Sequence, residues 1–125
     1  MRVSNDIVEV VKLLGTAGTT NVITAMPARR SPYFNMVELN QDGYATLSKK
    51  LPNSVYRRQD APKCFDMNAS IYAWKRDVLM NEENNSVFHP STLLYEMPED
   101  RSIDIDSELD WKIVAMIMSS RLEEI

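Results

Sequence analysis

The chain has 125 residues, which is the size of one ordinary domain and long enough to bury a hydrophobic core. Its apolar fraction of 44% and charged fraction of 26% are typical of a soluble globular protein. A net charge of -4 argues against nonspecific nucleic-acid binding, and no apolar run approaches the ~20 residues of a membrane-spanning helix. The single cysteine, Cys64, excludes an internal disulfide, so we expect a cytoplasmic protein.

The first predicted elements are a helix and a buried strand. Ser4 or Asn5 can cap a helix that begins near Asp6, and the glycines at positions 15 and 18 end it. Its apolar side chains lie at helical spacing on one face: Ile7, Val10, Val11 and Leu14. Residues 21–26, "NVITAM", are rich in β-branched side chains and predict a strand. A helix followed by a strand is the repeating step of an α/β fold.

The middle of the chain predicts a β-hairpin followed by a loop or arm. Two extended runs, at about 33–39 and 44–48, flank a turn that contains Asp42-Gly43. Residues 51–68 have no clear period, and their prolines favour a loop. We therefore expect residues 31–66 to project from the rest of a single domain of residues 1–125.

The last part of the chain returns to alternating strands and helices. Strands are predicted at 69–74 and 92–98, with a short helix beginning at residue 75 between them. A short fourth strand is predicted over "SIDID", residues 102–106, followed by a helix from Ser107 to about residue 124. Ser107 and Asp110 have the spacing of a capping box. The apolar stripe of this helix would contain Leu109, Ile113, Met116, Ile117 and Leu122. The fold class is thus α/β, with a mixed sheet covered by helices.

Asp104 and Asp106 are the first candidate for a chemical site. In a strand, residues i and i+2 share a face, so both carboxylates would point the same way, opposite Ile103 and Ile105. Two adjacent carboxylates repel each other unless a cation lies between them, and magnesium favours such oxygen ligands. The alternative is a pair of solvated acids at the end of a strand.

Arg57, Arg58 and Gln59 form a second candidate. Arginine forks match carboxylates and phosphates, and an amide can bind hydroxyl groups; the alternative is a solvated basic loop. Asn68 could bind a ligand or cap a turn. His89 is the only histidine, so no histidine pair is available for zinc.

Three segments together resemble the acylneuraminate cytidylyltransferases, also called CMP-sialic acid synthetases. "RRQDAPKCFDMNASIYAW" resembles their substrate and dimer-arm motif, of the form R-Q-x-x-P followed by N-G/A-A/S-I-Y. "RSIDIDSELDW" resembles their S-I-D-I-D-x-E-x-D motif, and "RRSPYFNMVELNQDGY" resembles the segment that leads into the dimerisation hairpin. The resemblance implies a Rossmann-like, nucleotide-sugar-transferase-like sheet with a hairpin arm. It also implies an enzyme that joins CTP to a nonulosonic acid, giving a CMP-sugar and pyrophosphate.

The same resemblance assigns roles to individual residues. Asp104 and Asp106 match the metal-binding pair, which implies Mg²⁺ as the cofactor. Arg58 and Gln59 match residues that reach the sugar acid, typically from the neighbouring subunit of a dimer, and Asn68 matches a position near the sugar site. A homodimer or higher oligomer is therefore expected.

The resemblance extends only to the C-terminal half of the family, whose members are nearly twice as long. Their first half carries a loop, of the form L-A-R-x-x-S-K-x-L-x-x-K-N, that holds the CTP phosphates. We therefore expect these 125 residues alone to be inactive, as part of a truncated or split enzyme. The alternative is a non-catalytic oligomerisation or binding remnant. Several bacterial members have an arginine at the position of Asp66 and a lysine near Phe34, so a related acid such as legionaminate is considered beside N-acetylneuraminate.

Overall fold

The computed structural model describes residues 2–53, 57–81, 83 and 86–123. Its backbone divides into two compact units, Met1–Met26 with Met67–Ile125, and Pro27–Asp66. We call the first the sheet unit and the second the hairpin unit. The hairpin unit contains the whole of the predicted arm, residues 31–66. Whether the two units form one domain stays a prediction, and each is described by itself.

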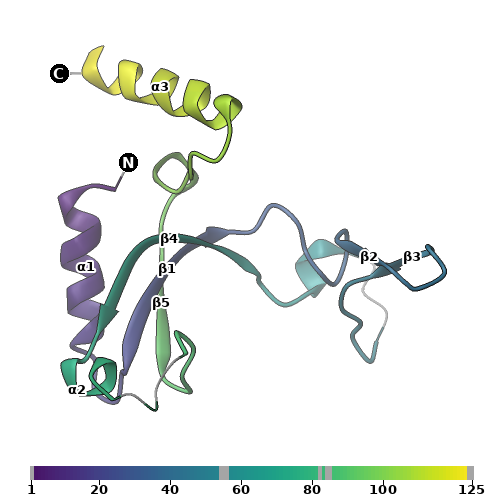
Figure 1. Cartoon of the computed structure of the whole chain (residues 1–125), viewed down its shortest axis with the longest axis horizontal. Helices are drawn as coiled ribbons and strands as arrows, with labels where there is room; N and C mark the ends of the chain where they lie inside the picture. The colour runs from purple at the N-terminus through teal and green to yellow at the C-terminus, as the bar shows by residue number, and fades with distance from the viewer. Residues whose placement is uncertain (1, 54–56, 82, 84–85, 124–125) are drawn as a thin grey trace. The chain divides into compact units, whose positions relative to one another are not determined.

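The sheet unit is built on three strands in the order β4-β1-β5 (Figure 1). The central strand β1, Asn21–Pro27, pairs in parallel with β5, Thr92–Glu96, so that Ile23 lies opposite Leu94. On its other side lies β4, Phe65–Trp74, whose first residues reach into the hairpin unit. Lys75 N–H donates to the Thr20 carbonyl at the end of β4 and the beginning of β1, so these strands run antiparallel. The predicted α/β class with a mixed sheet is confirmed, while the Rossmann-like assignment stays a prediction.

Helix α1, Ser4–Leu14, packs against β5. Val10 is completely buried, but Ile7 and Val11 of the predicted apolar face are about half exposed. The predicted start near Asp6 is wrong by two residues because Val3, not Ser4 or Asn5, is the N-cap. Asp6 supplies the capping acceptor from inside the first turn, where its carboxylate accepts the Val3 N–H at 2.9 Å.

Strand β4 contains a backbone irregularity at Ala69, whose φ of 46° lies in the left-handed region. A side chain at Cβ makes this conformation unfavourable, and alanine has no polar group that could offset the cost. Asn68 accepts the Ser70 N–H at 3.1 Å across this residue. Asn68 thus accepts a neighbouring backbone N–H, as a capping residue does, but it lies inside strand β4, where the structure has no turn.

We expect Ala69→Gly to raise the free energy of unfolding by about 0.5–1 kcal/mol. Glycine removes roughly 1–2 kcal/mol of backbone strain from the folded state, but it also increases the entropy of the unfolded chain, which offsets part of this gain. Ala73→Gly, in the same strand without a positive φ, should instead lower it by about 0.5–1 kcal/mol. Urea unfolding of both variants measures the difference. A loss of stability in both would contradict the assignment of strain to residue 69.

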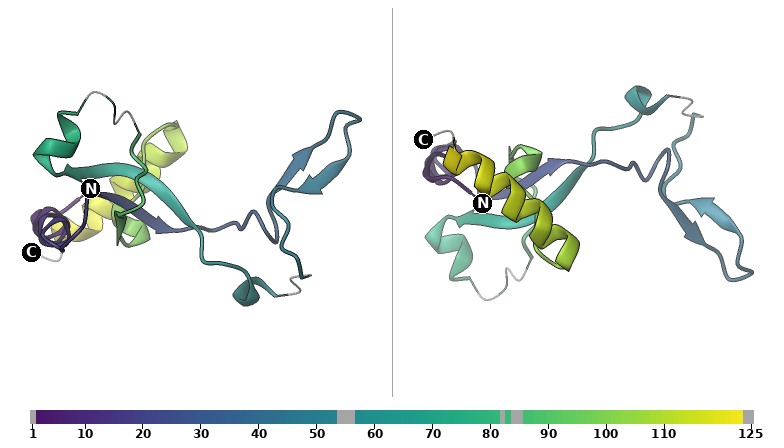
Figure 2. Two further views of the ribbon diagram at one scale, coloured as in Figure 1. Left: turned by 90° about the horizontal axis from the view of Figure 1, so that it is seen from below. Right: turned by 90° about the horizontal axis from the view of Figure 1, so that it is seen from above.

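The hairpin unit contains the predicted β-hairpin. Strands β2, Val37–Leu39, and β3, Ala45–Leu47, pair antiparallel with Glu38 opposite Thr46, and Figure 2 shows them side by side in both views. The turn between them needs Gly43, whose φ is 84°. The Asn40 side chain accepts the N–H groups of Asp42 and Tyr44, which fixes the turn. The first strand begins later than predicted because residues 34–36 all donate their N–H groups to the Ser31 carbonyl.

The predicted strand over residues 102–106 is wrong. This segment pairs with no strand and connects the 3-10 turn η2, Glu99–Arg101, to helix α3, Glu108–Glu123. Ile105, expected in the core, is 51% exposed. The alternation of isoleucine and aspartate is typical of a strand, but a strand also needs a free neighbour edge at that place.

The other two helices lie where the sequence predicted them, but their apolar side chains are less buried than predicted. Helix α2, Arg76–Leu79, is the predicted short helix, and the Ser107–Asp110 capping box is present. The expected apolar stripe of α3 is largely exposed: Leu109, Met116 and Leu122 lie at the surface, and Val114 is the buried apolar residue of this helix. Among the helices described, none has the length and hydrophobicity that a membrane span requires.

Candidate functional site

The acidic segment between η2 and α3 is held at both ends by side-chain hydrogen bonds. At its start, Ser102 Oγ donates to the Pro98 carbonyl at 2.8 Å and accepts from Asn68 Nδ2 at 3.0 Å. At its end, the Ser107 hydroxyl donates to Asp110 at 2.6 Å and, with two backbone N–H groups, lowers the pKa of this carboxyl group. Between these anchors Asp104 and Asp106 are both exposed. The two aspartates therefore lie on a short, fixed stretch open to a ligand.

Asn68 connects this segment to the sheet. Its side chain is 3% exposed and lies among polar groups, where Thr24 Oγ1 donates to its carbonyl oxygen at 2.7 Å. Its amide nitrogen donates to Ser102. Buried polar groups need such hydrogen-bond partners, so these contacts stabilise the fold. The substrate-binding role that the family resemblance implies for Asn68 stays a prediction.

We expect Asn68→Ala to lower the free energy of unfolding by about 2 kcal/mol, because it leaves the buried hydroxyl groups of Thr24 and Ser102 with fewer partners. Asn81→Ala removes an exposed amide whose oxygen accepts the Glu83 N–H, and should cost less than about 0.5 kcal/mol. Urea titrations compare the two. Equal stability of the Asn68 variant and the unmodified chain would argue that the residue serves ligand binding alone.

A second anchor of the acidic segment was not predicted from the sequence. Arg101, immediately before Ser102, forms two hydrogen bonds with Asp6 of α1, at 3.1 and 2.9 Å, and Tyr95 donates to the same carboxylate at 3.2 Å. The Asp6 side chain is fully buried. Because Asp6 and Arg101 lie 95 positions apart, no local pattern could pair them; the only signal was an acid in the first turn of a helix.

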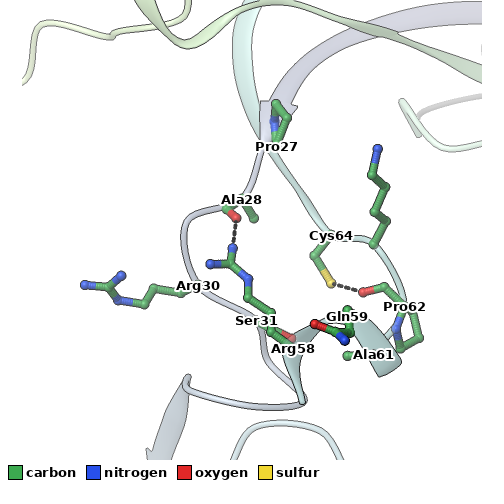
Figure 3. Close-up of a pocket in the computed structure, with 10 residues that line it drawn as sticks. Pro27, Ala28, Arg30, Ser31, Arg58, Gln59, Ala61, Pro62 and Cys64 are labelled. Atoms are coloured by element: carbon green, nitrogen blue, oxygen red, sulfur yellow. Dashed lines mark hydrogen bonds between the residues drawn. The ribbon is translucent and has the colours of Figure 1, made fainter.

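The pair Arg58 and Gln59 lies in the hairpin unit, at the 3-10 turn η1, Arg58–Asp60. Both line a pocket of about 520 Å³ formed by residues 27–28, 30–31, 58–59 and 61–64 (Figure 3). The Arg58 guanidinium donates to the carbonyl of Ala28 across this pocket. The structure therefore places Arg58 and Gln59 at a cavity, and their predicted role in binding the sugar acid stays a prediction.

The structure groups the predicted site residues by unit. Asn68, Asp104 and Asp106 belong to the sheet unit, where the Asn68–Ser102 hydrogen bond links the first to the segment that carries the other two. Arg58 and Gln59 belong to the hairpin unit.

Asp104 and Asp106 are both exposed, but the strand that would point their carboxylates the same way is absent, so a shared magnesium site stays a prediction. In the part of the chain that the structure describes, no three side chains of histidine, cysteine, aspartate or glutamate gather in a group that could hold a metal. Magnesium commonly binds proteins through one or two carboxylates and takes its other ligands from water and substrate phosphates. A site of this kind would share the metal with a phosphate-bearing substrate, and whether Asp104 and Asp106 form one stays a prediction.

The structure is that of an α/β protein with two exposed aspartates in the sheet unit and a pocket in the hairpin unit. Comparison with known proteins shows which proteins it resembles. No protein-family model matches the chain. Over 97% of its length it is 46% identical to the post-translational flagellin modification protein B of Campylobacter coli, of which it covers 49%. Over 78% of its length it is 54% identical to the CMP-N,N'-diacetyllegionaminic acid synthase of Campylobacter jejuni, of which it covers 40%.

These matches confirm the resemblance found in the motifs: the chain is similar to part of a sialic-type CMP synthetase. The chain spans about half the length, or less, of the curated relatives it matches.

Proposed function

We propose that this chain supplies the sugar-acid- and metal-binding half of an enzyme that transfers CMP from CTP to a nonulosonic acid. The observation that carries this proposal is the 54% identity with a CMP-N,N'-diacetyllegionaminic acid synthase. We take N,N'-diacetyllegionaminic acid as the first substrate to test. Asp66 and Phe34, where several sialic acid enzymes have basic residues, support a related acid over N-acetylneuraminate. The cytoplasmic location that the single cysteine indicates stays a prediction.

In the proposed reaction the anomeric hydroxyl of the sugar acid attacks the α-phosphorus of CTP. An oxygen–phosphorus bond forms between the sugar acid and the α-phosphorus, and the bond from the α-phosphorus to the oxygen that bridges it to the β-phosphorus breaks. Pyrophosphate leaves with the electron pair of that bond, and the hydroxyl proton passes to water. Asp104 and Asp106 would hold magnesium, which neutralises the charge that develops on the phosphates. Arg58 would bind the sugar carboxylate with its fork, and Gln59 would bind hydroxyl groups. Asn68 would contribute by positioning the segment that carries the aspartates.

We further propose that the CTP phosphates bind to polypeptide other than these 125 residues. A phosphate loop needs glycines before a helix, where backbone N–H groups converge on the anion. The three glycines of this chain lie elsewhere: Gly15 and Gly18 follow α1, and Gly43 is in the hairpin turn. We therefore expect the chain alone to have negligible transferase activity.

The test measures CMP-sugar formation from CTP, Mg²⁺ and N,N'-diacetyllegionaminic acid. It is run with the purified chain alone and with the part of the Campylobacter jejuni relative that the chain does not match, supplied as a second polypeptide. Turnover only in the mixture supports the proposal. Robust turnover by the chain alone would contradict the proposal that the CTP phosphates bind to polypeptide other than these 125 residues. Absence of turnover in the mixture, despite stable association of the two polypeptides, would favour a non-catalytic binding or oligomerisation role.

We also propose that the hairpin binds a second copy of the chain, as the dimer-arm motif implies. The register places Val37 opposite Leu47 and Leu39 opposite Ala45, so one face of the hairpin is entirely apolar, while Glu38 and Thr46 share the other. On this apolar face Leu39 is 72% and Val37 is 58% exposed. A two-stranded hairpin is marginally stable alone, and burying this face in a partner would stabilise it.

We expect Leu39→Asp to convert a dimer into a monomer, since the loss of one buried leucine weakens the dimer by about 2 kcal/mol, or roughly thirtyfold. Thr46→Asp adds the same charge to the opposite face of the hairpin and should leave the dimer intact. Light scattering at micromolar concentration reports the mass of each. A stable monomer of the unmodified chain would contradict the proposed contact.

A further inference from the structure

The acidic segment between η2 and α3 is not held by strand pairing, although it follows closely on the sheet. Met97, just after β5, is completely buried, and its N–H donates to the Ala25 carbonyl at 2.8 Å. Residues 99–101 then form η2, and residues 102–106 pair with no strand. The direction in which the segment leaves η2 therefore depends on side-chain contacts at that point.

The Asp6 carboxylate makes one of these contacts. Arg101, the last residue of η2, donates from Nε to Oδ2 of Asp6 at 3.1 Å and from Nη2 to Oδ1 at 2.9 Å. Two such bonds fix the orientation of a guanidinium as well as its position. Tyr95 donates to Oδ1 at 3.2 Å and the Val3 N–H donates to Oδ2 at 2.9 Å, so the carboxylate is itself held in one orientation. The last residue of η2 is thus tied to a fixed point on α1.

The burial of the Asp6–Arg101 pair favours a role beyond stability. The Asp6 side chain is 0% exposed, and that of Arg101 is 25% exposed. Replacing a buried ion pair by well-packed apolar side chains is often neutral or stabilising, so stability alone is a weak reason for such a pair. A buried pair does require one geometry, because breaking it leaves an unpaired charge in the interior. The pair is therefore suited to fix the direction of the chain that follows it.

The next residue, Ser102, is fixed from a different element. Its hydroxyl accepts from Asn68 of β4 at 3.0 Å and donates to the Pro98 carbonyl at 2.8 Å. Two successive residues are thus attached to α1 and to β4, and Asp104 follows only two positions later. Because each trans peptide leaves only two soft dihedral angles per residue, fixing both residues strongly limits where Asp104 can lie.

We propose that Asp6 and Arg101 are positioning residues of the transferase. Through their ion pair, α1 sets the direction in which the acidic segment leaves η2, and this holds Asp104 and Asp106 in one arrangement toward a metal. The inference rests on the proposed function in taking these two aspartates as metal ligands. It goes beyond it by giving a task to α1 and to an ion pair that the proposed reaction does not use.

The test compares two substitutions that both weaken the sheet unit but differ in their effect on the segment. Arg101→Lys keeps the positive charge but replaces the fork by a single ammonium group. Val10→Ala removes part of a completely buried side chain from the same helix and leaves the ion pair in place. NMR relaxation of the 125-residue chain measures the backbone order of residues 103–105. Their order parameters should fall from about 0.85 to below about 0.6 in Arg101→Lys and stay unchanged in Val10→Ala.

Tyr95→Phe is a milder variant that keeps the ion pair and removes one hydrogen bond to Asp6. It should lower the same order parameters by a smaller amount, and it carries the test if circular dichroism shows that Arg101→Lys does not fold. Tyr44→Phe, which removes the hydroxyl of a side chain that is 72% exposed, should leave them unchanged. Equal loss of order in Val10→Ala and the cluster variants would overturn the inference, as would unchanged order in all of them.

The two-polypeptide transferase assay gives the functional readout. In Arg101→Lys the Mg²⁺ concentration for half-maximal CMP transfer should rise about tenfold, while kcat at saturating Mg²⁺ stays within about twofold. A segment that spends only about a tenth of its time in the metal-binding arrangement lowers the apparent metal affinity by that factor, and saturating metal restores the arrangement. Val10→Ala should leave both quantities unchanged. A lower kcat with an unchanged Mg²⁺ requirement would contradict the positioning role.

The two readouts separate this inference from the function on which it rests. Absence of CMP transfer by every chain would refute the proposed function, while the order parameters would still show whether the Asp6–Arg101 pair holds the segment. Transfer with an unchanged Mg²⁺ requirement and unchanged order in Arg101→Lys would overturn the positioning role and leave the transferase proposal standing.

Discussion

Arg101→Gln is expected to lower the free energy of unfolding by about 3 kcal/mol, because it leaves the buried Asp6 carboxylate without its charge partner. The Asp6 side chain is completely buried, and Arg101 is only 25% exposed, so water screens this pair weakly. The pair also joins α1 to the turn before the acidic segment. The substitution should therefore destabilise the whole sheet unit and not one helix end.

The chain offers a matched control for this substitution. Arg121 pairs with Asp100, but the two side chains are 32% and 52% exposed. Arg121→Gln should cost less than about 1 kcal/mol, as exposed ion pairs generally do. Urea unfolding at neutral pH gives both values. Similar losses in the two variants would mean that burial does not strengthen the Asp6 pair.

The same ion pair predicts how stability depends on pH. Burial by itself raises the pKa of Asp6, but hydrogen bonds from Arg101 and from the Val3 N–H, together with the arginine charge, outweigh it, so the pKa lies below its usual 3.8. The folded state thus binds this proton less readily than the unfolded state. The stabilisation is complete above the unfolded pKa and disappears as the pH falls through the lower folded pKa.

Urea midpoints measured between about pH 6 and about pH 2 test this direction, with the unmodified chain losing more stability on acidification than Arg101→Gln. The arginine variant lacks the partner that lowers the Asp6 pKa, so less stability remains to be lost. Equal losses in both chains would assign the acid sensitivity to other carboxyl groups.

Elements specified by neighbouring residues were predicted correctly from the sequence. The end of α1 at Leu14, the short helix α2 and the turn at Gly43 each depend on a local signal, a glycine or a run of polar residues. The capping box of Ser107 and Asp110 is equally local. Strand β1 was predicted from its β-branched residues, and the structure buries its first five residues on both faces of the sheet.

Features that depend on distant residues were predicted poorly. "SIDID" alternates like a strand, yet it forms none, because pairing is decided by the neighbouring backbone and not by the segment itself. The predicted stripe of α3 is helical but mostly exposed, since burial requires a surface to pack against. The contacts of Asn68 with Thr24 and Ser102 join three segments, so the sequence indicated the residue without its partners.

In the two-polypeptide assay of the proposed transferase, Asp104→Asn and Asp106→Asn are each expected to reduce magnesium-dependent CMP transfer by about a hundredfold or more. The amide keeps the size of the side chain but removes the charge that would hold the metal in the proposed site, and charge stabilisation by a catalytic metal amounts to several kcal/mol. Both aspartates are exposed, so neither substitution should change the free energy of unfolding by more than about 0.5 kcal/mol. Loss of activity without loss of stability is the signature that separates metal ligands from structural residues.

Glu96→Gln is the matched control, because it removes one exposed carboxylate from the sheet unit at the end of β5 and should leave both properties unchanged. Metal binding can also be measured on the chain alone, through the broadening of backbone NMR signals by Mn²⁺. Broadening centred on residues 103–107 that disappears in both asparagine variants, but not in the Glu96 variant, supports a metal-binding pair. The opposite outcome is broadening that neither asparagine variant changes, together with retained transfer activity. It would show that Asp104 and Asp106 are solvated acids with no metal, the alternative interpretation of their spacing.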